Sequence, residues 1–254
     1  MIDIHSHILP GLDDGSPDMA ESVAMAKLAA ECGTTDLVAS PHADLQYAFD
    51  PAIVERKIAE LTEAAGGVIR IHYGCDFHLH YENVQDALAN PSKYAVNHKN
   101  YVLVELSELL VLKTADDVLE RMRAAGMIPI ITHPERNTVL QHRLEKLQAW
   151  AGNGCLIQVT GQSLLGRFGR KAHAFSVELL RRNLAHFVAS DGHDCQNRPP
   201  RLDDSFAWVR DQFGAGAADR LFTANPAAVL AGEDLPPEDS GAGTAPRKWW
   251  RPWK

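Results

Sequence analysis

A regular alternation of short apolar runs with longer segments of helical spacing constrains the fold of this chain more than any other feature. The runs are rich in β-branched residues, as is typical of strands buried on both faces. Seven runs occupy residues 1–4, 36–40, 68–73, 101–106, 127–132, 155–160 and 185–190. Helical spacing occurs between most of them, at residues 18–32, 52–65, 114–125, 141–152 and 171–183.

Strands that alternate with helices in this way predict a parallel α/β fold. Seven repeats within 254 residues suit a TIM-like barrel that forms one domain. Asp18 and Glu21 predict a capping box at the start of the first helix, and Gly33 and Gly126 stand where helix C-caps are expected.

Composition narrows the class of protein. We expect a soluble protein that stays in the cytoplasm, because the sequence has neither a signal-peptide pattern nor an apolar stretch long enough to span a membrane. The four cysteines are widely spaced, which favours reduced thiols over disulfides. A formal net charge of −8 argues against extended nucleic-acid binding.

Histidine and carboxylate residues follow six of the seven predicted strands. The carboxyl ends of parallel barrel strands meet on one face, where such enzymes assemble their active sites. Imidazole and carboxylate groups without cysteine favour zinc, manganese or iron in a catalytic site. The candidate ligands are His5, His7, Asp14, His42, Asp76, Glu105, His133, Asp191 and His193. Because nine groups exceed what one ion can use, we predict a multinuclear centre bridged by Glu105.

Several separated motifs resemble those of a known superfamily. The stretches "DIHSH", "DDG", "SPH", "HPER" and "SDGHDCQNRPP", in this order, resemble the PHP (polymerase and histidinol phosphatase) superfamily. "QVTGQSLLGRFGRKA" and "ASDGHDCQNRPPRL" are similar to its bacterial manganese-dependent protein-tyrosine phosphatases of capsular and exopolysaccharide clusters. The resemblance covers residues 1–231, which we expect to form the phosphatase domain.

The resemblance implies a distorted (β/α)7 barrel with three divalent ions at the carboxyl ends of its strands. It also implies manganese, with iron or zinc as alternatives, and a phosphotyrosine protein as substrate. That substrate would be a bacterial tyrosine kinase that controls polysaccharide synthesis.

The family's metal ligands fall on the nine positions named above. Within "DDG" we choose Asp14, with Asp13 as the alternative. Asp76 stands where the family usually has glutamate, which puts the position of its metal in question. His78 and His80 could compensate, although we interpret both as exposed loop histidines.

Two arginines follow the predicted ligand strands closely. Arg136 in "HPER" and Arg198 in "NRPP" are expected to bind phosphate, because guanidinium groups match phosphate oxygens bidentately. We expect direct attack of activated water on phosphorus, with no covalent phosphoenzyme. His42 or His193 would deliver a proton to the leaving group.

Two alternatives stay open at this point, and a third pattern is rejected. A small-molecule phosphatase of the histidinol phosphate type would share the same phosphate-binding residues. A metal-dependent amidohydrolase also has H-x-H after its first strand, but Glu105 stands where its bridging lysine would be. Residues 195–201 fit the C-x5-R pattern of cysteine-dependent phosphatases, although Pro199 and Pro200 lack the N–H groups that such a loop requires.

The C-terminal residues change in character. Residues 232–254 read as an acidic, Pro- and Gly-rich linker followed by the basic, tryptophan-rich "RKWWRPWK". The segment Arg247–Lys254 either makes a weak contact with an anionic membrane surface or is a disordered tail.

Overall fold

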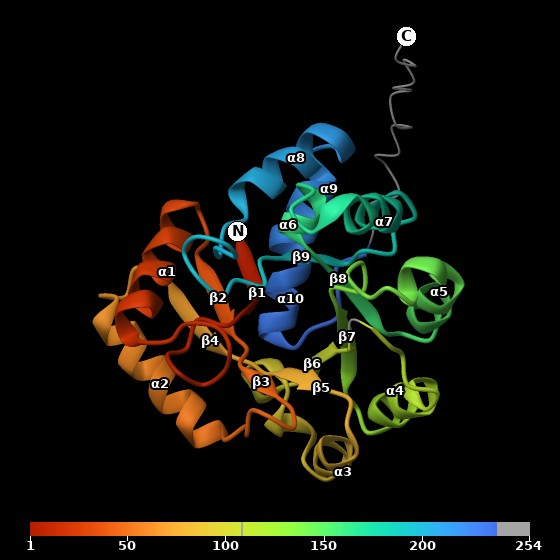
Figure 1. The fold of residues 1–254 in the computed structure, drawn as a ribbon, viewed down its shortest axis with the longest axis horizontal. Coiled ribbons are helices and arrows are strands. Elements are labelled where there is room, and N and C mark those ends of the chain that lie inside the picture. The colour runs from red at the N-terminus through yellow and green to blue at the C-terminus, as the bar shows by residue number, and fades with distance from the viewer. Residues whose placement is uncertain (108, 238–254) are drawn as a thin grey trace.

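A computed structural model describes residues 1–107 and 109–237 and contains two parallel sheets surrounded by helices (Figure 1). The first sheet has the order β1-β2-β4 and the second the order β3-β5-β6-β7-β8-β9. The strands are β1 Ile2–Ser6, β2 Asp36–Ala39, β3 His42–Ala43, β4 Arg70–Tyr73, β5 Asp76–His78, β6 Tyr101–Glu105, β7 Ile128–Thr132, β8 Leu156–Thr160 and β9 Phe187–Ala189. The prediction of a parallel α/β fold is confirmed.

Two of the seven predicted apolar runs are followed by a short second strand. β2 is followed by β3 and β4 by β5, and each of these later strands belongs to the other sheet. Pro41 lies at the first break and has no backbone N–H to donate to a ladder. Gly74 lies at the second, where a Cβ would come within 2.4 Å of the Val38 side chain. At each break the chain passes from the first sheet to the second.

The two sheets meet beside β1 without forming one continuous ladder. Ser6 makes a single parallel bridge with Gly192, and the His7 amide donates to the Gly192 carbonyl at 2.8 Å. Among the described residues, the backbone therefore forms nine strands in two sheets, where we expected seven strands in one closed barrel.

Within residues 1–107 and 109–237 the five predicted helices are present, together with five that the sequence analysis did not predict. The helices are α1 Met19–Glu31, α2 Pro51–Ala64, α3 Tyr81–Ala89, α4 Ala115–Ala124, α5 Leu144–Gly152, α6 Gly161–Leu164, α7 Gly169–Arg181, α8 Asp203–Phe213, α9 Ala215–Asp219 and α10 Asn225–Ala231. Asp18 caps α1 by accepting a hydrogen bond from the Glu21 amide at 3.0 Å. The Glu21 carboxylate does not complete the capping box and instead accepts from the Cys195 amide at 2.8 Å.

Helix α10 packs at the amino ends of the strands (Figure 1). Val229 of this helix belongs to a buried cluster with Ile4, Leu103 and Phe187. This apolar packing fills the space between the strands from one end, which leaves the carboxyl ends free to carry polar groups.

The described residues include no helix that is both long and apolar enough to cross a membrane. The predicted membrane contact of Arg247–Lys254, and most of the predicted linker, lie outside the described residues.

Candidate active site

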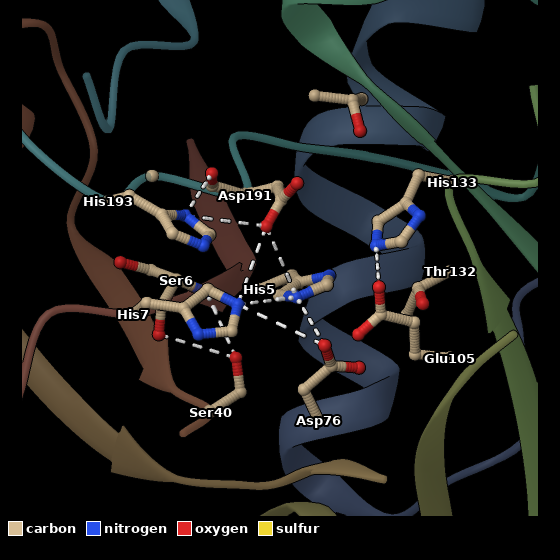
Figure 2. Close-up of polar contacts among 12 residues, drawn as sticks. His5, Ser6, His7, Ser40, Asp76, Glu105, Thr132, His133, Asp191 and His193 are labelled. Carbon is tan, nitrogen blue, oxygen red and sulfur yellow. Dashed lines mark hydrogen bonds and ion pairs between the residues drawn. The ribbon is translucent and has the colours of Figure 1, made fainter. Parts of the chain in front are cut away.

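The predicted ligands converge at the carboxyl ends of the strands. Figure 2 shows His5, His7, Asp76 and Asp191 pointing toward one another. Among the described residues, ligand atoms within 4.8 Å of one another form four groups: His7, Asp14, His42 and His193; His42, Asp76, His78 and Glu105; His5, His7 and Asp76; and His5, His133 and Asp191. All nine predicted ligands belong to at least one group, and His78 joins them.

His5 of β1 and His7, one residue beyond the end of that strand, point to the same side, as the i, i+2 spacing of an extended chain predicts. Their Nε2 atoms lie 3.2 Å apart. Nδ1 of His5 is 2.8 Å from Gln158 Oε1, and Nδ1 of His7 is 2.7 Å from Asp13 Oδ2. Such contacts favour the tautomer that leaves Nε2 free to bind a metal ion. Gln158 was missed by the sequence analysis, which considered only His, Asp and Glu at strand ends.

The two adjacent aspartates of "DDG" have different surroundings. Asp13 faces His7 and also accepts hydrogen bonds from the amides of Gly15 and His42. Asp14 Oδ1 is 3.3 Å from His42 Nε2 and 3.5 Å from His193 Nε2. The loop folds this tightly because Gly15 lies against His7, where a Cβ would be 2.1 Å from the carbonyl oxygen. The geometry therefore favours Asp14 over Asp13 as the ligand.

Asp76 is a fully buried carboxylate whose two oxygens have no hydrogen-bond partner within the described part of the chain. Its Oδ2 lies 3.5 Å from His5 Nε2 and 3.2 Å from His42 Nδ1. Burial opposes ionisation, but the two histidines hold the pKa of Asp76 well below its usual range. A buried carboxylate that lacks hydrogen bonds and lies among imidazoles offers the donor atoms of a metal site, so this position fits a metal ion. Aspartate here reaches the imidazoles despite being one methylene shorter than glutamate.

His78 corrects one expectation, because it lies in the site and not on an exposed loop. It is the last residue of β5, paired in register with Glu105, and its Nε2 is 2.6 Å from Glu105 Oε2. The i, i+2 spacing from Asp76 was the signal that could have placed it. His80 lies outside the four groups, with Nδ1 3.1 Å from Glu82 Oε2.

Glu105 reaches two of the groups with different oxygens. Oε1 is 3.6 Å from His133 Nε2, whereas Oε2 is 3.4 Å from His42 Nδ1. Burial and the charge of Asp76 raise the pKa of Glu105. One carboxylate placed between two sets of ligands has the geometry of a bridge.

Both predicted phosphate-binding arginines contact the same carboxylate, that of Asp191. Arg136 and Arg198 each donate to its Oδ2, while Oδ1 is 3.5 Å from His5 Nε2. The Arg136 guanidinium also lies over the Phe168 ring, 4.7 Å from its centroid. Asp191 and His133 have φ values of 53° and 33°, a strained conformation for non-glycine residues that is often found at active sites.

The histidines of the site differ in their hold on a proton. Burial disfavours protonation of His5 and His42, but the neighbouring carboxylates raise the pKa of His5 to about 9 and that of His42 to about 12. Burial and the neighbouring His7 lower the pKa of His193. The pKa of His133 lies well below its usual range, because His133 is buried and close to Arg136. Without a metal ion, His5 and His42 thus hold a proton tightly, whereas the imidazoles of His133 and His193 lose theirs easily.

The cysteine-dependent alternative is not supported by the surroundings of Cys195. Burial and the adjacent Glu21 carboxylate raise the pKa of its thiol to about 11, whereas a nucleophilic cysteine needs a lowered pKa. Arg201 pairs with Asp203 at 2.7 Å.

A parallel α/β fold with clustered imidazoles and carboxylates beside two arginines is typical of metal-dependent hydrolases that act on phosphate esters. The comparisons with known proteins agree with this class. Residues 1–231 match the family described as "Capsular polysaccharide synthesis, CpsB/CapC", and the chain belongs to this family.

Named relatives make the comparison more specific. The chain is 33% identical over 224 residues to tyrosine-protein phosphatase YwqE of Bacillus subtilis, covering 85% of this chain and 86% of that protein. It is 33% identical over 210 residues to the putative tyrosine-protein phosphatase CapC of Staphylococcus aureus, covering 81% and 82%.

A solved structure is also similar over most of the chain. It comes from work on YwqE of Bacillus subtilis and CpsB of Streptococcus pneumoniae, which are described there as unique metal-dependent tyrosine phosphatases. The TM-score is 0.86 at 31% identity, covering 92% of this chain and 96% of that one. The resemblance drawn from the motifs is confirmed, and the histidinol phosphate alternative gains no support over it.

Proposed function

We propose that this protein is a metal-dependent tyrosine-protein phosphatase. The observation that carries the proposal is the buried Asp76 carboxylate, which lacks hydrogen-bond partners among the described residues and lies between imidazoles. Two arginines that match phosphate lie at the same centre. The relative YwqE is a tyrosine-protein phosphatase, and this agrees with the chemistry of the site.

We assign the metal ligands from the four groups. His7, Asp14, His42 and His193 would hold one ion, and Asp76, His78 and Glu105 a second. His5, His133 and Asp191 would hold a third, with Glu105 as the bridge. The mixture of oxygen and imidazole nitrogen suits manganese, the preferred metal of this proposal. The single bridge between Ser6 and Gly192 supports the inference that the two sheets together form a distorted (β/α)7 barrel.

Bound divalent ions would polarise phosphoryl oxygens and lower the pKa of a water molecule. Arg136 and Arg198 bind and orient the phosphate. His42 or His193, where it is not engaged as a metal ligand, would deliver a proton to the leaving oxygen. A tyrosine leaving group has a pKa of about 10, so it needs less help from an acid than an alkyl alcohol does.

The substrate we propose is phosphotyrosine on a protein, specifically a tyrosine kinase that controls capsular or exopolysaccharide synthesis. The family description, capsular polysaccharide synthesis, supports this choice.

The deciding experiment compares phosphate release from a phosphotyrosine peptide and from histidinol phosphate, each with manganese and with a chelator. We expect manganese-dependent turnover of the peptide that the chelator abolishes, and no comparable turnover of histidinol phosphate. A Cys195→Ser variant serves as the control and should retain this activity. Faster turnover of histidinol phosphate, or loss of activity only in the serine variant, would overturn the proposal.

A further inference from the structure

Large apolar side chains are exposed mainly on one face of the molecule. Seven of them are exposed among the described residues, and five follow β3, β5 and β6, four of them on loops and Tyr81 at the first position of α3. We define these five as the apolar rim: Leu45, Tyr81, Leu109, Leu110 and Leu112. Leu45 is 85% exposed, Tyr81 75% and Leu109 76%.

The segments that carry the rim follow neighbouring strands. β3 pairs with β5, and β5 pairs with β6, so the loops at their carboxyl ends are adjacent. Asn83 of α3 donates to the Ala43 carbonyl at 2.5 Å, which holds the Leu45 loop against the start of α3 and Tyr81. The rim residues thus lie on three adjacent segments of the chain.

The rim is also tied to the phosphate-binding part of the site. Asn137, the residue after Arg136, donates to the carbonyls of Ser107 at 2.6 Å and Leu110 at 3.2 Å. Leu45 is three residues beyond His42, and Leu109 is four beyond Glu105. At about 3.5 Å per extended residue, the rim begins within roughly 10–14 Å of chain from these site residues.

This position limits what the rim can bind. A small phosphate ester that reaches the arginines is too short to cover side chains on three segments of the chain. An extended peptide whose phosphotyrosine lies at the arginines reaches the rim within about three residues. Exposed apolar groups gathered in one place mark interaction surfaces more often than isolated ones do.

We propose that the apolar rim binds the residues next to phosphotyrosine in a protein substrate and selects segments with apolar side chains there. The inference rests on the proposed phosphatase function. It adds a sequence preference that the metal centre and arginines, which contact only the phosphate, do not provide.

The test uses two phosphotyrosine peptides of equal length and charge. One has Leu and Phe at the two positions on each side of the phosphotyrosine, and the other has Ser and Gly. We expect wild-type protein with manganese to show about a tenfold higher kcat/KM for the apolar peptide, the size of effect expected from a few buried apolar anchors. The ratio of the two values cancels any change in folding or metal content.

In the variant Leu109→Ser/Leu110→Ser this ratio should fall toward one, and Leu45→Ser should lower it independently. The matched control is Val68→Ser, which changes an exposed apolar residue that is 47% accessible and precedes β4 at the opposite end of the strands. The control should keep the tenfold ratio.

The outcomes separate the two proposals. A wild-type ratio near one, with both peptides hydrolysed, would overturn the rim and leave the phosphatase function standing. A rim variant that keeps its ratio but loses mass in light scattering would show the rim to be a contact between copies of this chain. If wild-type protein releases phosphate from neither peptide, the phosphatase proposal fails, and the rim with it.

Discussion

At the scale of single residues, Asp76 carries the strongest indication of what this site does. Its buried oxygens lie among imidazoles without hydrogen bonds from the described residues. The same atoms in an isolated carboxylate would cost several kcal/mol to bury. Metal binding would remove this cost and release the protons held by His5 and His42, whose pKa values are about 9 and about 12.

We therefore predict that Asp76→Asn weakens manganese binding by about 100-fold or more, because the amide keeps the shape but loses the charge. Thermal unfolding should show this directly: manganese raises the Tm of wild-type protein and raises that of the variant much less. Asp76→Glu, which keeps the carboxylate and lengthens the side chain by one methylene, is the matched control and should retain most of the shift. An equal Tm shift in Asp76→Asn and wild type would exclude Asp76 as a ligand.

At the scale of elements, an ion pair far from the site joins the amino ends of two strands. Asp36 of β2 stands opposite Arg70 of β4, and the guanidinium makes two contacts of 2.6 Å with its carboxylate. Burial opposes ionisation, but Arg70 and His72 lower the pKa of Asp36 to about 2. Arg70 is exposed, so solvent screens the pair and we expect only a small contribution to stability.

The sign of the pH dependence follows from this lowered pKa. The stability due to Asp36 should be complete above its unfolded pKa of about 4 and lost as the pH falls toward 2. Asp36→Asn should lower the free energy of unfolding at pH 7 and flatten its decline between pH 4 and 2, as measured by urea unfolding. Glu178→Gln, which breaks an exposed pair between Glu178 of α7 and Arg182, should change the free energy of unfolding little. Equal effects of the two substitutions would contradict this account.

At the scale of the whole molecule, the described residues have their own core, and the basic tail lies outside them. We predict that deleting residues 247–254 lowers co-sedimentation with anionic vesicles and leaves hydrolysis of a small phosphate ester unchanged. Vesicles made only of zwitterionic lipid are the control and should bind both forms weakly. Equal sedimentation of the full and shortened chains with anionic vesicles would dismiss the membrane contact.

The breaks after β2 and β4 show why the strand count differed from the prediction. Apolar runs locate strands well, because periodicity and β-branching are local signals. The short strands β3 and β5 contain only two and three residues, among them His42, Asp76 and His78, and are not apolar runs. They exist because neighbouring strands hold them in register. The helices α8 and α10 escaped prediction for a related reason, since packing stabilises an amphipathic helix more than its own propensity does.

The sequence by itself determined the alternation of strands and helices, the family, and the set of nine candidate ligands, since each depends on residue type and spacing along the chain. Only the tertiary structure decided what depends on direction in space: that Asp14 turns toward His42 while Asp13 turns toward His7, that Gln158 supports His5, and that His78 joins Glu105. Spacing places a side chain on a face of a strand, but hydrogen bonds from distant segments fix where its donor atoms point.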